Sequence, residues 1–461
     1  MLKGGRSGGF KRRQVNEMKK IPPILAALAM TFALPAFAQD AAATEAAAPV
    51  SADVAYVFNT LLFLIGGFLV MWMAAGFSML EAGLVRSKNV TVQLFKNISL
   101  FAIAGLMYWL IGYNLMYPSD DTWTIAGVIG TFFSPVSLDP VGAGDVAGGY
   151  SAGSDFFFQL MFCATTASIV SGTLAERIRL WPFMIFTVIL TGLIYPIEAS
   201  WQWGGGFLSE MGFSDFAGST LVHATGGFAA LAGAIVLGAR EGKYRADGRM
   251  QPLPGSNLAL ATLGTFILWL GWFGFNGASQ LAIGSVNDAA DVSRIFVNTN
   301  MAASAGVIAA IALTHVLYGK IDLTMVLNGA LAGLVSITAE PLFPSIFGSV
   351  LIGAVGGALA VLVVPVLDRL KIDDVVGAIP VHLVAGIWGT LIVPASNPDA
   401  SFGAQIIGIV AIGVFTFVTS FAIWMVLKAT MGIRVTPEAE ITGLDVSEMG
   451  MEAYPDFIQA K

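Results

Sequence analysis

The fold of this chain is decided by long apolar runs such as residues 349–367, which read SVLIGAVGGALAVLVVPVL. A helix of about 20 residues crosses the hydrocarbon core of a bilayer, and this uncharged run is close to that length. Apolar residues make up 56% of the 461 positions, and charged residues make up only 11%. The composition therefore predicts an all-α polytopic membrane protein.

Working outward from that run, hydropathy places about eleven membrane spans along the chain. Fifty-three glycines fit this class, because small residues let helix backbones approach closely in lipid. The single cysteine, Cys163, excludes an internal disulfide framework. We expect one transmembrane domain over residues 54–428. Its predicted spans are 54–83, 98–117, 155–175, 181–200, 216–239, 257–282, 294–317, 324–342, 345–366, 376–396 and 403–428.

The N-terminal segment 1–38 has the features of a cleavable signal peptide. Lys19 and Lys20 precede an apolar core over 21–34, and a small-x-small site ends at Ala38. Met18 would be a natural start, so the residues before it form an N-terminal extension. An uncleaved first helix is the alternative, although the apolar core is short for a span. Residues 39–53 then form an Ala-rich periplasmic lead-in.

The distribution of basic residues predicts the orientation. Cleavage after Ala38 leaves the mature N-terminus outside, and an odd number of spans places the C-terminus inside. Loops on the cytoplasmic side carry an excess of Lys and Arg, and only Arg294 falls on the predicted outer side. Residues 429–461 would then form a cytoplasmic regulatory tail. The basic residues on the predicted inner side are Arg86, Lys88, Lys96, Arg177, Arg179, Arg240, Lys243, Arg245, Arg249, Lys320, Arg369, Lys371, Lys428, Arg434 and Lys461.

Two of the three histidines lie inside predicted spans and share the pattern Val-His-x-x-x-Gly. His223 falls in the fifth span and His382 in the tenth. Five spans followed by five more, with an odd number in each unit, are typical of an inverted-topology repeat. Equivalent helices meet near the midplane in such folds, so we expect the two imidazoles to face each other. The eleventh helix would be an addition outside the repeat.

A buried histidine pair is suited to handling protons, because each ring can donate from one nitrogen and accept at the other. A zinc site needs three or four ligands, and no Cys, Asp or Glu lies three or four residues from His223 or His382. The simpler explanation is two separate core histidines bonded to backbone carbonyls. The third, His315, falls near the inner end of the seventh span and is expected to be interfacial.

Aromatic residues cluster near the predicted outer ends of several spans, in 158–162, 201–206 and 272–279. A belt of Trp and Tyr at the headgroup level is the ordinary explanation. It explains poorly Trp203, which precedes three glycines, or Phe275 beside Asn276 within a span. Ring faces attract a desolvated monovalent cation, so we expect a cation site there. Asp215, at the start of the fifth span, is most simply a helix cap.

The predicted outer loop 139–155 contains Asp139, Asp145 and Asp155, and no basic residue lies between Lys96 and Arg177. Such a surface would mildly concentrate small cations. A solvated loop that follows the charge bias of membrane proteins is the simpler explanation.

Several stretches carry a more specific pattern, in the order GLVRSKN (83–89), AERIR (175–179), WGGG (203–206), DFAGSTLVH (215–223), WFGFNGAS (272–279), NGALAGLVSIT (328–338) and DDVVGAIPVH (373–382). In these motifs the chain resembles the Amt/Mep/Rh ammonium transporter family, in its bacterial Amt branch. The motifs cover nearly the whole mature chain. Leu383 and Met449 depart from the resemblance, at positions where the family often has Gly and His.

The resemblance implies the roles of particular residues. Phe162, Trp203 and Ser279 would form an outer recruitment site for ammonium, and Asp215 would support that site without touching the ion. Phe162 and Phe275 would stack as a gate beneath it. The pore residues below or around the gate would be His223, His382, Trp272, Asn276 and Thr338.

A hydrophobic pore can separate ammonium from potassium, because only ammonium can lose a proton and pass as a neutral molecule. We therefore expect deprotonation near the outer site and reprotonation inside. Transport could be electrically neutral, or electrogenic if the histidines pass the proton separately.

The resemblance also implies a homotrimer in the bacterial cytoplasmic (inner) membrane, methylammonium as a substrate analogue, and a PII-type signalling protein at the cytoplasmic face. We expect no cofactor, no metal, no nucleic acid partner and no enzymatic activity. An ammonium sensor that signals through the tail is the main alternative. A membrane metalloenzyme lacks ligands, and a carbon dioxide channel would not need the aromatic recruitment residues.

Overall fold

The computed structural model describes residues 50–118, 122–132, 135–136, 149–245, 247 and 249–455. The predicted signal peptide 1–38 and most of the lead-in 39–53 lie outside the described residues. Every regular element within the described ranges is helical, apart from isolated bridges such as that between Ile178 and Arg434. The protein is thus an all-helical membrane protein, as the composition predicted.

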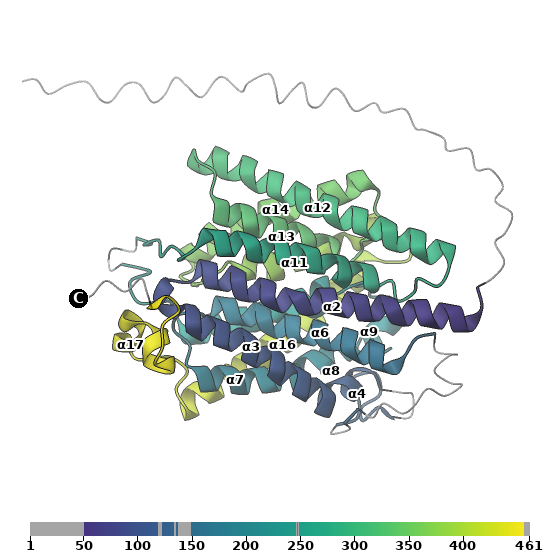
Figure 1. Cartoon of the computed structure of the whole chain (residues 1–461), viewed down its shortest axis with the longest axis horizontal. Helices are drawn as coiled ribbons and strands as arrows, with labels where there is room; N and C mark the ends of the chain where they lie inside the picture. The colour runs from purple at the N-terminus through teal and green to yellow at the C-terminus, as the bar shows by residue number, and fades with distance from the viewer. Residues whose placement is uncertain are drawn as a thin grey trace, which may run out of the picture. The chain divides into compact units, whose positions relative to one another are not determined.

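Nine helical stretches of the described chain are long and apolar enough to cross a bilayer. Figure 1 shows the long helices side by side, with α2 against α11 and α12 against α14. The nine stretches are Ala52–Leu84 (α2), Ser87–Met116 (η1, α3, η2 and α4), Ala152–Thr173 (α6), Leu180–Ser200 (α7, η4 and α8), Ser219–Leu237 (η5 and α10), Leu258–Ala278 (α11), Val286–Tyr318 (α12), Ile346–Arg369 (α14) and Phe402–Thr430 (α16).

Two further apolar helical segments are shorter, α13 (Leu323–Ile337) and Ile379–Ala395, which comprises η6, α15 and η7. The predicted spans 324–342 and 376–396 fall on them. Every residue of α13 from Leu327 to Ile337 is buried. The carbonyls of Thr338 and Ala339, just beyond α13, accept hydrogen bonds from the amides of Ala217 and Phe216. A short helix is stable here because protein, rather than lipid, satisfies the backbone beyond its end.

The two histidine-bearing segments are built in the same way. His223 lies in the π-helical stretch η5 (Ser219–Ala224), and His382 lies in the π-helical stretch η6 (Ile379–Val384). An aspartate eight positions before each histidine caps its stretch. Asp215 accepts four backbone N–H bonds of 2.7 to 3.0 Å from residues 218–221. Asp374 accepts bonds of 3.2 and 2.7 Å from Gly377 and Ile379.

A glycine stands three positions after each capping aspartate. Gly218 has φ +98° and Gly377 has φ +78°, in the left-handed region where a Cβ atom is disfavoured. The repeated pattern Asp-x-x-Gly before each histidine therefore has a conformational reason. It lets the chain turn sharply into a capped helix that carries the histidine.

Two other glycines let these segments cross closely. A Cβ atom on Gly227 in α10 (Thr225–Leu237) would lie 2.6 Å from Cβ of Leu383. A Cβ atom on Gly386 in α15 (Ala385–Ile392) would collide with the carbonyl oxygen of Ser219. Each glycine of the repeated Val-His-x-x-x-Gly pattern thus makes room for the segment that holds the other histidine.

A buried ion cluster joins the loops at the end of the bundle near the C-terminal tail. The Glu176 carboxylate lies 2.6 Å from Nε of Arg86 and 3.1 Å from Nη1 of Arg240. The Arg240 side chain also donates to both oxygens of Asp373, at 2.8 and 2.9 Å. Burial alone would raise the pKa values of these two carboxyls, but the neighbouring arginines lower both. The cluster therefore stays ionised at neutral pH.

The tail folds back onto the same end of the bundle. Its α17 (Pro437–Thr442) and η8 (Asp445–Met449) lie near the start of α3 (Val90–Met107), as Figure 1 shows in yellow and purple. The Asp445 carboxylate accepts bonds of 2.9 and 2.8 Å from the amides of Thr91 and Val92. This capping contact fixes the described part of the tail to the transmembrane domain.

We expect Gly386→Ala to destabilise the protein by about 1–3 kcal/mol, because the new methyl group would collide with backbone at the crossing. The midpoint of thermal unfolding in detergent measures this loss. Gly105→Ala is the matched control, since the nearest atom to its Cβ position is 4.0 Å away. Equal unfolding midpoints for the two variants would show that the crossing is not close.

Acid is expected to weaken the ion cluster. A carboxyl whose pKa is lowered by folding stabilises the protein above its ordinary pKa of about 4, and this stabilisation is lost as the pH falls below that value. Asp373→Asn leaves the buried Arg240 with Glu176 as its remaining charged partner and should cost about 1–3 kcal/mol at neutral pH. The unfolding midpoint of this variant should also depend less on pH between about 5 and 3.

Asp247→Asn is the control for the acid experiment, because Asp247 and its partner Arg249 are both largely exposed, with side chains 51% and 81% accessible. An exposed pair contributes at most about 1 kcal/mol. An acid profile of Asp373→Asn that matched both this control and the wild type would contradict the prediction.

Candidate functional site

A large cavity opens at the end of the bundle opposite the ion cluster, above the first half of α6 and the C-terminal end of α11. Its volume is about 740 Å³. Phe162, Trp203, Asp215 and Ser279, the residues predicted for the outer site, all line it. The other lining residues are Tyr113, Tyr117, Tyr150, Ala152, Asp155, Gln159, Gln202, Phe216, Gln280 and Leu281.

Two stacked phenyl rings close the inner side of this cavity. The rings of Phe162 and Phe275 lie 4.0 Å apart between centroids, with an angle of 25° between their planes. Trp203 meets Phe162 edge to face at 5.9 Å. Both phenylalanines are almost completely buried, and their stacked rings are in contact, which leaves no space for a molecule between them. Passage between the cavity and the interior requires one or both rings to rotate.

The polar groups around Trp203 are held in place by backbone bonds. The indole Nε1 of Trp203 donates to the carbonyl oxygen of Asp215 at 3.0 Å. The Ser279 hydroxyl donates to the carbonyl of Phe275 at 2.8 Å, which leaves its oxygen as an acceptor. Because the Asp215 carboxylate already accepts four backbone bonds, its main structural task is to cap η5. The backbone carbonyl of Asp215 in turn holds the indole of Trp203.

The two histidine rings lie directly beyond the phenyl pair. His223 stacks against Phe275 at 5.2 Å and against Trp272 at 4.9 Å. The Nδ1 atoms of His223 and His382 are 3.3 Å apart, and both rings are buried. Of two nitrogens in contact, one must donate and the other accept. A hydrogen bond between the two Nδ1 atoms therefore requires one ring to carry its proton at Nδ1 and the other at Nε2.

Trp272 and Asn276 are held in place by hydrogen bonds to threonine hydroxyl groups. The Trp272 Nε1 donates to Oγ1 of Thr338 at 2.7 Å, and that hydroxyl donates onward to the carbonyl of Leu334. The Asn276 amide donates to Oγ1 of Thr299 at 3.0 Å. Trp272 thus presents its ring to His223, whereas Asn276 and Thr338 line neither the outer cavity nor the inner pocket.

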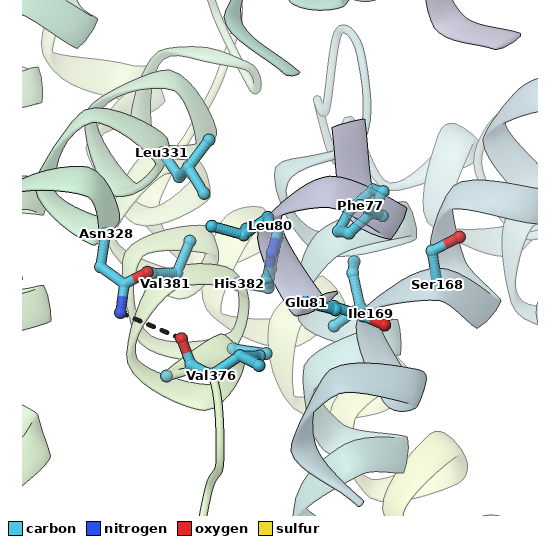
Figure 2. Close-up of a pocket in the computed structure, with 12 residues that line it drawn as sticks. Phe77, Leu80, Glu81, Ser168, Ile169, Asn328, Leu331, Val376, Val381 and His382 are labelled. Carbon is cyan, nitrogen blue, oxygen red and sulfur yellow. Dashed lines mark hydrogen bonds between the residues drawn. The ribbon is translucent and has the colours of Figure 1, made fainter. Parts of the chain in front are cut away.

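A second, much narrower pocket begins at His382. Its volume of about 10 Å³ is the space of about one water-sized molecule. Phe77, Ile169, Leu331 and Val381 make most of its wall apolar. Figure 2 shows Asn328 beside it, donating its amide to the carbonyl of Val376 at 3.1 Å.

Glu81 is the residue of this pocket that the motif analysis missed. It is buried in α2 and lines the same pocket as His382 (Figure 2). Its carboxylate accepts from Asn97 at 2.6 Å, from Ser171 at 3.1 Å and from Gln93. Lys96, which was expected among the inner basic residues, is also fully buried here. A charged residue inside a predicted span was the available signal.

The rings form a continuous series from the large cavity to the narrow pocket: Trp203, Phe162, Phe275, His223 and His382. An aromatic cavity, a closed ring pair and a narrow apolar pocket at a buried histidine pair, all within a helical bundle, indicate a class of protein, namely a membrane transporter or channel for a small polar solute.

Comparison with known proteins identifies the family. The model of the Ammonium Transporter Family matches residues 61–454. The chain is 42% identical to the ammonium transporter Amt2 of Archaeoglobus fulgidus over 427 residues, which cover 86% of this chain and 88% of that protein. It is 33% identical to an ammonium transporter of Bacillus subtilis, with 86% and 98% covered. The chain therefore belongs to the ammonium transporter family.

Solved structures show the same fold. A sensor Amt protein superimposes with a TM-score of 0.79 at 35% identity, covering 87% of this chain and 100% of that chain. Mep2 of Saccharomyces cerevisiae superimposes with a TM-score of 0.74 at 25% identity, covering 84% and 90%. These proteins and the present chain share one helical architecture.

We expect Thr338→Val to destabilise the protein by about 1–3 kcal/mol, because the buried Trp272 N–H would lose its acceptor. Trp272→Phe in the same chain removes the unsatisfied donor. The double variant should therefore lose less free energy of unfolding than the two single variants lose together. Thermal unfolding of the wild type, both single variants and the double variant measures the coupling. Strictly additive losses would mean that the hydrogen bond contributes nothing.

Proposed function

We propose that this protein carries ammonium across the cytoplasmic membrane by recruiting the cation in the outer cavity and conducting it as ammonia past the two histidines. The observation that carries this proposal is the series of ring contacts that links the cavity of about 740 Å³ to the pocket of about 10 Å³. Family membership supports ammonium as the substrate.

Recruitment would take place at Phe162, Trp203 and Ser279. The ring faces attract an ammonium ion with about 2 kcal/mol or more where water is excluded. The Ser279 oxygen can accept a hydrogen bond from ammonium, because its own proton is bound to the Phe275 carbonyl. A hydroxyl oxygen can also coordinate potassium through its lone pair, so the selection against potassium rests on the gate beyond this site.

Deprotonation would follow at the ring gate. Moving an ion into an apolar interior costs several kcal/mol even after relaxation, and a neutral amine avoids most of that cost. Ammonia can slip between Phe162 and Phe275 when they rotate, whereas potassium keeps its charge and is rejected. The histidine pair would then accept ammonia by hydrogen bonds at the ring nitrogens, where the Nε2 of His223 has no partner in the described chain.

If the released proton returns to the water of the outer cavity, transport is electrically neutral, and if it passes along the histidine pair, transport is electrogenic. The contact between the Nδ1 atoms offers a route for a proton, since one ring can protonate while the other releases. Simultaneous measurement of current and internal pH after an ammonium pulse to proteoliposomes separates the two possibilities.

The proposal includes an arrangement of eleven membrane helices, with the N-terminus outside, the C-terminus inside and a five-plus-five inverted repeat. The similar Asp-x-x-Gly caps before His223 and His382 support the repeat. The basic residues gathered around the ion cluster support an inner position for that end. A cleaved signal peptide over 1–38, a homotrimer and docking of a PII-type protein on the tail belong to the same proposal.

Sensing is the second candidate function. The tail contacts the transmembrane domain at the start of α3 and at the amide of Leu180, which donates to Glu448 at 3.3 Å. A change in these helices on ammonium binding would therefore reach the tail. Flux through proteoliposomes that contain only this protein supports transport, whereas binding without flux supports a sensor.

Replacing either pore histidine with leucine should reduce methylammonium flux by at least about tenfold, because both proton acceptance and hydrogen bonding to ammonia are lost. Uptake by proteoliposomes measures the effect. His315→Ala is the control, since this histidine is exposed at the end of α12 and should keep full flux. Wild-type flux in both His223→Leu and His382→Leu would remove the pair from the mechanism.

Trp203→Leu should raise the half-saturating methylammonium concentration about tenfold, since a cation–ring contact is lost. Potassium should also compete better in this variant. Trp181→Leu serves as the control, because Trp181 is 73% exposed on the surface of the bundle. Equal inhibition of methylammonium uptake by potassium in Trp203→Leu and in wild type would contradict a role of the Trp203 ring in selecting ammonium.

A further inference from the structure

Asp155 has a place in the structure that differs from its expected place in a solvated acidic loop. It lies in the first turn of α6 and is only 8% exposed. Its carboxylate lines the outer cavity together with Gln159 and Phe162. Positions 155, 159 and 162 fall on one face of the helix, with Asp155 about 10 Å nearer the start of α6 than Phe162.

The Asp155 carboxylate has no cationic partner. None of the ion pairs in the described chain involves it. No Lys or Arg is among the described residues that line the cavity. Its short hydrogen bond is with a neutral group, the hydroxyl of Tyr113, at 2.5 Å. A nearly buried carboxylate that lacks a counter-ion is a costly feature unless a cation binds beside it.

The surroundings of Asp155 are those of a cation site. Tyr113, Tyr117 and Tyr150 bring three aromatic rings to the same cavity, and the rings of Tyr113 and Tyr117 lie 5.3 Å apart. Burial and the neighbouring Asp155 carboxylate raise the pKa of Tyr150, so its hydroxyl stays neutral. Aromatic rings around a carboxylate are suited to ammonium and alkylammonium cations.

Two amide oxygens complete the arrangement. The Oε1 atoms of Gln159 and Gln202 are buried at the cavity and have no hydrogen-bond partner in the described chain. Gln159 is itself only 8% exposed. Buried acceptors of this kind are normally satisfied, so their orientation fits a donor that enters the cavity, as an ammonium N–H would.

The ligand set excludes a divalent metal. Such ions need several carboxylate or carbonyl oxygens, and no cluster of three or more His, Cys, Asp or Glu exists among the described residues. The second carboxylate of the cavity, that of Asp215, is occupied by four backbone amides.

We propose that Asp155, the tyrosine rings and Gln159 form a second binding site for ammonium or methylammonium, upstream of the site at Phe162, Trp203 and Ser279. This inference rests on the proposed transport function and adds a step to it. The cation is first held in the vestibule by charge and ring faces. It then moves about two helical turns along α6 to the ring gate, where the proton is lost.

The test compares methylammonium uptake by proteoliposomes that contain wild type, Asp155→Asn or Asp53→Asn. Asn keeps an acceptor for Tyr113 but loses the charge, so the half-saturating concentration should rise about tenfold while most of the maximal rate is retained. Asp53→Asn removes the same charge from an exposed residue at the start of α2, outside the cavity, and should leave both values as in wild type.

Two results would overturn the proposal. An unchanged half-saturating concentration in Asp155→Asn, with or without a lower maximal rate, would reduce Asp155 to a structural residue. An equal rise in Asp53→Asn would assign the effect to general surface potential. If wild-type vesicles carry no methylammonium, the proposed transport function fails, and calorimetric titration of the detergent-solubilised wild type and Asp155→Asn with methylammonium still decides whether the site exists.

A pair of Tyr113 variants tests the ring contribution without changing the carboxylate, and decides the matter if Asp155→Asn does not fold. Tyr113→Phe keeps the ring and releases the carboxylate from its hydrogen bond, so methylammonium should bind at least as tightly as to wild type. Tyr113→Leu loses the ring and should bind about threefold more weakly. Equal affinities of the two variants would contradict the aromatic part of the site.

Discussion

The structure depends on the close crossing of the two segments that carry His223 and His382. Gly227 and Gly386 remove the side chains that would keep these segments apart. As a result, two imidazoles that are 159 residues apart in sequence come within 3.3 Å of each other. A methyl group at either glycine would displace backbone, not a flexible side chain, so the geometry tolerates little change.

That crossing also has to be supported at its ends. Asp215 and Asp374 accept hydrogen bonds from backbone amides that would otherwise have no acceptor within the membrane domain. The cap at Asp215 also fixes the carbonyl that accepts from Trp203, so the same residue links the histidine segment to the outer cavity. The capping of η5 and the position of Trp203 are therefore coupled through one residue.

Charged groups are distributed unevenly along the molecule. Paired charges gather at the tail end, where Arg240 bridges Glu176 and Asp373. The narrow pocket at His382 is lined mainly by rings and aliphatic side chains, together with Glu81. The outer cavity holds a carboxylate without a cation, at Asp155. Under the proposed transport function, a cation would be attracted at the mouth and disfavoured in the centre, as a pore for a neutral species requires.

The sequence alone determined the class of the protein, the order of its helical segments and the residue types of the site. Hydropathy and short motifs are local properties, so they located 349–367 as a span and singled out Trp203, Phe275 and both histidines. Local patterns also predicted spans of about bilayer length at 324–342 and 376–396. The structure instead has short helices at 323–337 and 379–395, because neighbouring protein satisfies their ends.

The repeat and the family resemblance led us to expect the histidine pair and the stacked phenyl rings, but only the tertiary structure decided the contacts that these residues make. The stacking of Phe162 on Phe275, the burial of Lys96 beside Glu81 and the position of Asp155 in the cavity all depend on contacts between helices distant in sequence. Asp155 was indistinguishable in sequence from the aspartates of a solvated loop. Its role depends on what surrounds it, and a one-dimensional pattern contains no information on the helices that approach from the side.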